Sequence, residues 1–181
     1  MKHDTERLLK VCLSVTFANK KPDIDSSALH KLTYGVFVLT AKDQKDNGCI
    51  TNTAIQVAND PMRISVSVQK GNYTREMIEK TKKFNVSVLT DDVPFEIIKH
   101  FGMQSGRDVD KFESFTATAT ASNGIKYITE HTNAYFSAEV VSSLDLGSHV
   151  LFIGEITEAK SLSKDNSCNY AHYHASIKPK F

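Results

Sequence analysis

Short runs in which apolar and polar residues alternate dominate the sequence from residue 33 onward, and they restrict the possible folds more than any other feature. Such runs occupy residues 64–69, 84–88, 115–121, 134–140 and 150–156. A period of two residues is typical of a β-strand with one buried face. Residues 34–40 are apolar on both faces, which predicts a strand covered on both sides. The sequence therefore predicts a mainly β protein.

Short helices interrupt the predicted strands. The first is expected at residues 74–82, and the second begins after Asp92, an N-cap residue, with Pro94 in its first turn and Gly102 at its end. The polar residues 104–112 that follow are expected to form a surface loop. Many strands with few helices favour a closed or nearly closed antiparallel barrel, because closure removes the unpaired edges of a sheet.

The charge balance and the cysteine content argue against several classes of protein. Lys and Arg total 22 and Asp and Glu total 21, so the net charge of +1 gives no reason to expect nucleic acid or an anionic membrane as a partner. No apolar run approaches the roughly 20 residues that a transmembrane helix needs. The 3 cysteines include no CxxC pair, which argues against a disulfide framework and a zinc or rubredoxin-type iron site and fits a reducing cytoplasm.

The chain length of 181 residues suits one domain. The N-terminal residues superficially resemble a signal peptide, but acidic residues lie in the basic part, Ser14 and Thr16 dilute the apolar part, and no A-x-A cleavage site follows. We therefore assign residues 1–23 to an N-terminal extension whose structure the sequence does not define, and residues 24–181 to the domain.

A polar segment follows the turn at Asn47-Gly48. The strand expected there carries Thr51-Asn52-Thr53 and Gln56, and polar side chains in a buried strand need hydrogen-bond partners. Either neighbouring backbone or a polar ligand would supply them. Cys49 in the same segment is interpreted as a small buried residue rather than a reactive thiol.

The segment from Gln69 to Arg75 ends a predicted strand and opens a predicted helix. Backbone N–H groups at a helix N-terminus attract anions, and Lys70, Thr74 and Arg75 would add further donors, so a phosphate would fit there. The alternative is capping alone, with Asn72 or Thr74 as the N-cap and the two cations in solvent.

Histidines stand in two further segments. Gly147-Ser148-His149 is a glycine turn that brings a histidine to the start of an apolar strand, where it would titrate or donate a hydrogen bond, unless it only satisfies the turn. His172 and His174 alternate as two metal ligands on one strand would. Because no third ligand is evident nearby, aromatic stacking on a planar ligand or a dimer contact is favoured and no metal site is assigned.

These segments, in this order, make the chain resemble the flavin reductase-like family. The resemblance runs from about residue 26 to residue 180 and is strongest to flavoredoxin and to the flavin reductase module of high-molecular-weight rubredoxins. It is carried by Gly48-Cys49-Ile50-Thr51-Asn52-Thr53, Asp60-Pro61, Asn72-Tyr73-Thr74, Phe84-Asn85-Val86-Ser87-Val88-Leu89, Phe101-Gly102, Ser105-Gly106-Arg107-Asp108, Asp110-Lys111-Phe112 and Gly147-Ser148-His149. Many flavin reductases have two small hydroxyl residues where this chain has Asn52-Thr53, so cofactor contacts are expected to differ in detail.

The resemblance implies an FMN-binding split β-barrel, antiparallel with Greek-key connections and a few short helices. It also implies an NAD(P)H:flavin oxidoreductase that works as a homodimer and passes electrons to a rubredoxin, a flavodiiron protein or free flavin. The absence of a CxxC pair means that a rubredoxin would be a separate protein. An FMN electron-transfer protein without nicotinamide activity is the main alternative, and a barrel that has lost its cofactor is another.

The resemblance also implies where the cofactor lies. Residues 51–54 would contact the flavin ring and ribityl chain, residues 70–74 would hold the phosphate, and the turn at residues 147–149 would lie near the ring where nicotinamide docks. The implied FMN contacts are Asn47, Cys49, Thr51, Asn52, Thr53, Ala54, Gln69, Lys70, Asn72, Tyr73, Thr74, Ser148 and His149. His149, on the nicotinamide side, and backbone donors of residues 51–54 are the implied electrostatic contributors to catalysis.

Overall fold

The computed structural model describes residues 23–180, so the predicted N-terminal extension lies outside the described residues except for Asp23. The chain divides into two compact units at Lys31 and Leu32. The described part of the first unit holds a short 3-10 helix, η1 (Ser26–Lys31). Everything described below belongs to the second unit.

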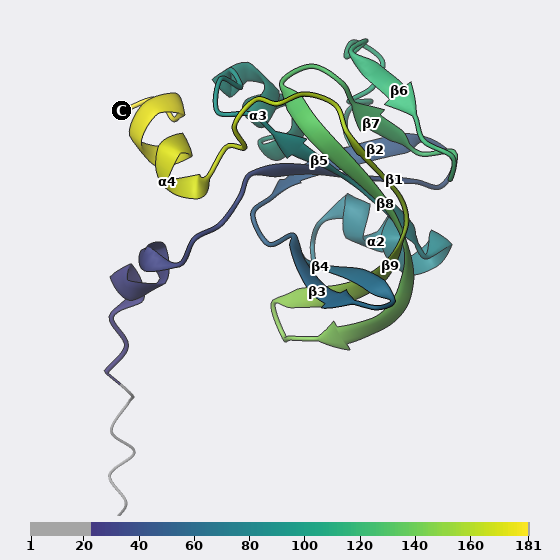
Figure 1. Ribbon diagram of the computed structural model, residues 1–181, viewed down its shortest axis with the longest axis horizontal. Coiled ribbons are helices and arrows are strands. Elements are labelled where there is room, and N and C mark those ends of the chain that lie inside the picture. The colour runs from purple at the N-terminus through teal and green to yellow at the C-terminus, as the bar shows by residue number, and fades with distance from the viewer. Residues whose placement is uncertain (1–22, 181) are drawn as a thin grey trace, which may run out of the picture. The chain divides into compact units, whose positions relative to one another are not determined.

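A seven-stranded antiparallel sheet, with strand order β2-β1-β5-β8-β9-β4-β3, forms the second unit's framework (Figure 1). Its strands are β1 (Phe37–Lys42), β2 (Asp46–Thr51), β3 (Ile55–Asn59), β4 (Met62–Gln69), β5 (Lys83–Leu89), β8 (Thr132–Asp145) and β9 (His149–Ser161). A separate two-stranded ribbon consists of β6 (Thr118–Thr120) and β7 (Lys126–Ile128). The helices are α2 (Tyr73–Thr81), α3 (Phe95–Gly102), α4 (Tyr170–His172) and the short π-helix η2 (Tyr173–Ile177).

The sheet closes on itself because its two outer strands are neighbours in the sequence. Residues 52–54 alone connect β2, at one edge, to β3, at the other. At this seam the Thr53 hydroxyl donates to the backbone oxygen of Ser67 at 2.9 Å and accepts from the Ser67 N–H at 3.1 Å. The Thr53 side chain thus provides hydrogen-bond partners for the backbone groups of Ser67 on β4, where backbone pairing with β3 has ended. The predicted mainly β, split-barrel architecture is confirmed.

Apolar side chains at alternating strand positions fill the barrel. Leu39, Val66, Phe84 and Phe152 are fully buried there, and α2 adds Met77 and Ile78 to the same cluster. On β4 and β9 the buried apolar residues Ile64, Val66, Val68, Val150 and Phe152 occupy every second position, as the two-residue period predicted.

Phe84 reaches its position because β9 has a glycine opposite it. A Cβ atom at Gly154 would lie 2.7 Å from Cζ of Phe84 and 2.9 Å from Cβ of Ala138, both in the barrel core. Real Cβ atoms do not approach other heavy atoms so closely, so no larger residue fits at position 154 without movement of the core.

A second core covers the outer face of β1. Val36 and Val38 pack there with Ile97, Ile98 and Phe101 of α3, whereas Leu39 and Ala41 face the barrel interior. Residues 34–40 are therefore covered on both sides, as their composition predicted.

Three predicted element boundaries are wrong. The turn expected at Asn47-Gly48 lies inside β2, where both residues pair with β1, and the strand expected after it is divided into β2 and β3 by residues 52–54. Only Thr118–Thr120 of the predicted strand 115–121 is a strand, because its partner β7 offers just three residues for pairing. Asp92 does not cap α3, which begins at Phe95 with Pro94 in the N-cap position. The Asp92 carboxylate instead accepts a hydrogen bond from Thr90 and pairs with His131 Nδ1 at 3.2 Å.

The histidine pair near the C-terminus lies on helical turns of α4 and η2, so the strand-like alternation assumed for it is wrong. The His172 ring nitrogen Nε2 is 2.9 Å from the backbone oxygen of Asp91. His174 packs edge-on against Tyr170, with 4.5 Å between ring centroids. No cluster of three or more potential metal ligands occurs among residues 23–180.

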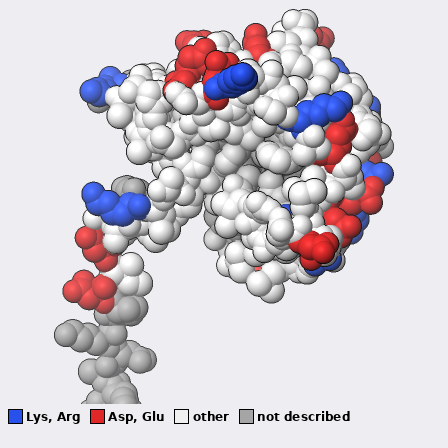
Figure 2. All heavy atoms as spheres, in the orientation of Figure 1, with Lys and Arg blue, Asp and Glu red and all other residues white. Residues whose placement is uncertain are grey.

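Charged side chains of opposite sign lie beside one another on the face shown in Figure 2, around an uncharged central part. Ion pairs of the barrel include Lys70 with Asp145 at 2.7 Å and Lys83 with Glu139 at 3.2 Å. This face therefore presents no extended field of a single sign.

Within the described part of the chain, no helix is long and apolar enough to cross a membrane.

Candidate functional site

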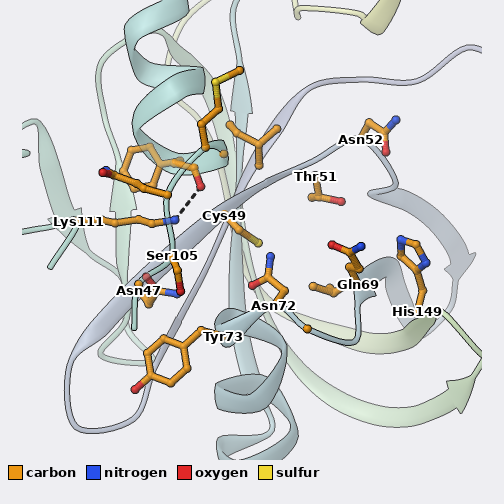
Figure 3. A pocket seen from close by; sticks show the side chains of 18 of the residues that line it. Asn47, Cys49, Thr51, Asn52, Gln69, Asn72, Tyr73, Ser105, Lys111 and His149 are labelled. Atoms are coloured by element: carbon orange, nitrogen blue, oxygen red, sulfur yellow. Dashed lines mark hydrogen bonds between the residues drawn. The ribbon is translucent and has the colours of Figure 1, made fainter. Parts of the chain in front are cut away.

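An open cleft of about 650 Å³ lies where β2, the end of β4, the start of α2 and the segment after α3 meet (Figure 3). Its volume falls in the usual range of ligand sites, which is about 300 to 1,000 Å³. Polar and apolar residues line it together: Asn47, Cys49, Ile50, Thr51, Asn52, Thr53, Ser67, Val68, Gln69, Gly71, Asn72, Tyr73, Phe101, Gly102, Met103, Gln104, Ser105, Gly106, Lys111 and His149.

Helix α2 opens at one wall of the cleft. Asn72 is its N-cap, and the Asn72 side-chain oxygen accepts from the Thr74 N–H at 2.8 Å. A Cβ atom at the preceding Gly71 would meet nothing within 4 Å, so the approach to the helix N-terminus is open. Helices leave their first N–H groups without intrahelical partners, and these groups favour anions.

Cations surround Tyr73, the first residue of α2. The Arg107 guanidinium lies 4.9 Å from the centre of the Tyr73 ring, and Lys45 Nζ lies 5.9 Å from it. Arg107 also forms an ion pair with Glu76. In Figure 3, Tyr73 gathers with Asn47 and Ser105 at one end of the cleft. This end combines helix N–H groups with positive charge.

The loop after α3 is fastened to β2 through a glycine. A Cβ atom at Gly106 would lie 1.9 Å from the Asn47 side-chain oxygen, so the loop backbone touches the amide directly. The other end of the amide donates to the Thr74 hydroxyl at 2.9 Å. Through these two contacts Asn47 links β2, α2 and the loop after α3. The residue is only 2% exposed, at the bottom of the cleft.

A buried lysine lies in the wall of the cleft. Lys111 is only 3% exposed, and its ammonium donates to the backbone oxygens of Gly48 and Phe101, both at 2.8 Å. An ammonium has three N–H donors, and the third has no acceptor among the described residues. Burial lowers the pKa of Lys111. One unused donor at a cleft wall is available to a ligand.

The Cys49 thiol lies near this lysine and is also buried, at 5% exposure. Burial raises the pKa of Cys49, although Thr74 and Lys111 act in the opposite direction. A thiol with a raised pKa stays protonated and unreactive at neutral pH. The interpretation of Cys49 as a small buried residue is confirmed.

The other end of the cleft has free amides and a histidine. In Figure 3, Asn52, Gln69 and His149 lie at this end, away from Tyr73. Gln69 and His149 are directly opposite each other on β4 and β9. The side chains of Asn52 and Gln69 form no hydrogen bond with another described residue, whereas His149 Nδ1 is 2.9 Å from the Ser148 hydroxyl. Free amides can donate to and accept from a polar heterocycle.

The cleft brings together nine of the residues proposed from the sequence as cofactor contacts: Asn47, Cys49, Thr51, Asn52, Thr53, Gln69, Asn72, Tyr73 and His149. The other four do not line it. Ala54 and Thr74 are buried beside it, and Ser148 supports His149 from outside. Lys70 is exposed and paired with Asp145.

Sequence reasoning did not assign one whole wall of the cleft. This wall consists of residues at the end of α3 and in the following segment, which was interpreted as a surface loop: Phe101, Gly102, Met103, Gln104, Ser105, Gly106 and Lys111. Lys111 and Phe112 are in fact buried, at 3% and 8% exposure. The available signal was the motif from Ser105 to Phe112, which the resemblance included but which carried no assigned role.

Comparison with known proteins identifies a family and relatives. The family described as "Flavin reductase like domain" matches residues 29–178. High molecular weight rubredoxin of Moorella thermoacetica is 40% identical over 152 residues, which cover 83% of this chain and 66% of that protein. The chain thus spans slightly under two thirds of that relative's length.

A second relative matches over nearly its full length. Ferric-chelate reductase (NAD(P)H) of Archaeoglobus fulgidus is 33% identical over 158 residues, covering 87% of this chain and 93% of that protein. Among solved structures, flavoredoxin from Methanosarcina acetivorans superimposes with a TM-score of 0.65 and 25% identity, covering 71% of this chain and 69% of that one.

Proposed function

Because the chain belongs to the flavin reductase-like family, we propose that it is an NAD(P)H:flavin oxidoreductase that binds FMN in the cleft beside α2. The observation that carries the proposal is the cleft itself, which joins a helix N-terminus, free amides and a buried ammonium on one surface. FMN supplies the hydride and electron chemistry when bound. The protein has to bind, orient and shield it.

The two ends of the cleft suit the two ends of FMN. The first turn of α2, with Asn72 and Tyr73 and the cations around them, would hold the phosphate. The opposite end, with Asn52 and Gln69, would hold the polar edge of the ring. The residues present therefore fit the cofactor.

Lys111 would face the cofactor from the wall between these ends. Its third N–H would donate to an electron-rich atom of FMN, and its charge would favour the negative charge that reduction adds to a flavin. Because Lys111 is only 3% exposed and two of its N–H groups bond to backbone carbonyls, little water competes for this ammonium. Lys111 thereby stabilises the reduced form.

His149 would bound the nicotinamide side of the ring. It is partly exposed at the start of β9, and Ser148 holds its Nδ1 atom at 2.9 Å. The relative named ferric-chelate reductase (NAD(P)H) supports a nicotinamide donor. The relative named high molecular weight rubredoxin supports a rubredoxin-type acceptor, and a flavodiiron protein or free flavin would serve the same role.

The alternative is an electron carrier that does not react with NAD(P)H. The similarity to flavoredoxin favours it, since the same FMN site would serve one-electron transfer between proteins. Reduction of the bound flavin by NAD(P)H distinguishes the two functions.

We further propose that the chain is a homodimer. Ile55, Val57 and Met62 on β3 and β4 are 59%, 46% and 54% exposed, beside an apolar hollow of about 220 Å³ at the barrel mouth. Exposed apolar side chains on an edge strand favour a covering partner.

Sedimentation tests the dimer. The wild type should sediment as a dimer and Val57→Asp as a monomer, whereas the control Leu162→Asp, at an exposed site elsewhere, should remain a dimer. A wild type that sediments only as a monomer contradicts this.

The FMN site is tested by blocking the open approach to α2. Gly71→Leu adds a side chain whose Cβ meets no atom within 4 Å, so we expect the fold to be kept while the side chain fills the proposed phosphate position. We expect FMN affinity, measured by flavin fluorescence quenching, to fall more than about tenfold. Lys164→Leu, at an exposed position outside the cleft, adds the same side chain and should bind FMN normally. Unchanged affinity in Gly71→Leu would remove the phosphate assignment.

A further inference from the structure

Lys111 is held at both of its ends by consecutive residues of α3. Its ammonium donates to the backbone oxygen of Phe101 at 2.8 Å. Its own backbone oxygen lies 2.6 Å from Nε2 of His100. His100 therefore fixes the backbone from which the lysine side chain reaches the cleft wall.

The hydrogen bonds define the state of the His100 ring. A carbonyl oxygen only accepts, so Nε2 carries the hydrogen that bonds to Lys111. Nδ1 faces the amide nitrogen of Gln104 at 3.3 Å, and the same nitrogen donates to the His100 backbone oxygen at 2.9 Å. Gln104 and Lys111 both line the cleft, so one imidazole fastens two parts of its wall to α3.

His100 itself does not line the cleft. Its ring stacks on Phe115, with 5.6 Å between centroids and 26° between planes, and meets Phe101 edge-on at 4.9 Å. Any influence on a bound ligand must therefore pass through the residues that the ring holds.

We propose that His100 is a positioning residue that sets the affinity of the cleft for FMN by holding the Lys111 ammonium in place. This inference rests on the proposed binding of FMN. A charge-assisted hydrogen bond loses strength when its donor is misplaced by a fraction of an ångström. The backbone at position 111 needs the imidazole donor to keep the ammonium aligned with Gly48, Phe101 and the cofactor.

Two variants separate the hydrogen bond of His100 from its packing. His100→Phe keeps an aromatic ring against Phe115 but has no donor for the Lys111 oxygen. His100→Gln loses the ring but carries an amide N–H near the position of Nε2. We expect His100→Phe to raise the Kd for FMN about five- to tenfold, as for loss of a hydrogen bond that supports a charged group, and His100→Gln to stay within about twofold of wild type.

The same pair of variants in a Lys111→Met background tests the route of the effect. With no ammonium to position, His100→Phe should change FMN affinity less than about twofold, so the two substitutions should be strongly non-additive. Additive losses, or failure of His100→Gln to preserve affinity, would overturn the proposal and leave His100 with a packing role only.

A double-mutant cycle measured without FMN keeps this inference separate from the proposed function. Urea unfolding would be followed for the wild type, His100→Phe, Lys111→Met and the double variant, and the losses in the free energy of unfolding should be non-additive. Failure of the wild type to bind FMN would overturn the proposed function, whereas additive unfolding free energies would overturn the link between His100 and Lys111.

Discussion

The barrel seam should be sensitive to the loss of a single hydroxyl. Thr53→Val removes the Oγ1 atom that donates to the Ser67 oxygen at 2.9 Å and accepts from the Ser67 N–H at 3.1 Å, while keeping the shape of the side chain. Because the Thr53 proton goes to Ser67, the 2.9 Å contact with Thr51 must use the Thr51 proton. The change therefore leaves up to three polar groups without their partner.

The size of the effect follows from these contacts. An unsatisfied buried group costs about 1–3 kcal/mol, and partial exposure of this seam allows water to recover part of it. We expect a total loss of about 2 kcal/mol in the free energy of unfolding, which corresponds to a fall in Tm of roughly 4 to 8 °C for a chain of this size. Thermal and urea unfolding followed by circular dichroism would measure both quantities.

Thr53→Ser is the matched control, because it keeps the hydroxyl and loses only a methyl group. It should retain most of the wild-type stability. If Thr53→Val is as stable as the wild type, or if Thr53→Ser is destabilised equally, the side-chain seam does not hold β4 as we infer.

Three further outcomes follow from the structure. The 2.6 Å hydrogen bond from Tyr135 helps to hold the pKa of Glu158 at about 2, below its ordinary value of 4.5, so its stabilisation is complete above about pH 4.5 and is lost as the pH falls toward 2. Tyr135→Phe should cost about 1.5–3 kcal/mol at pH 7, and urea unfolding should show a smaller difference from wild type at pH 3. Gly106→Ala should displace Asn47, lowering Tm and weakening FMN binding in fluorescence titrations. Lys70→Ala should change the Kd for FMN by less than about threefold, because Lys70 lies outside the cleft and is already paired.

Local pattern predicted the strands well because it reports directly on burial. Residues 64–69 and 84–88 alternate between large apolar and polar side chains, and the barrel core contains Ile64, Val66, Val68, Phe84 and Val86. Residues 115–121 alternate too, but mostly with small alanines, and tertiary pairing limits the strand to Thr118–Thr120. Alternation of small apolar side chains with polar ones therefore indicates strand length less well than alternation of large ones does.

Contacts between residues distant in sequence explain the errors. Asp92 is a residue type that often caps helices, but its carboxylate bonds to Thr90 and His131 instead, and α3 begins later. The sequence near Asp92 does not show that His131 lies close to it in the fold. Local propensity therefore identified the helix without its starting residue.

The same reasoning applies to the site. Polar side chains and a helix-start signal led to the segments at residues 47–53 and 69–73, which the fold brings together in the cleft, although Asn47-Gly48 lies within β2 and forms no turn. Lys111 could not be assigned from its neighbours, because its burial depends on the carbonyl oxygens of Gly48 and Phe101. A lysine in a polar stretch is usually solvated, and only the tertiary structure reveals that this one is enclosed.

Anaerobic mixing of the FMN-loaded protein with NADH, and separately with NADPH, tests the proposed reductase activity. At least one of the two nucleotides should bleach the flavin absorbance within seconds at neutral pH. A flavin that stays oxidised with both nucleotides, yet is bleached by dithionite, would contradict the reductase activity and favour an electron carrier reduced by another protein.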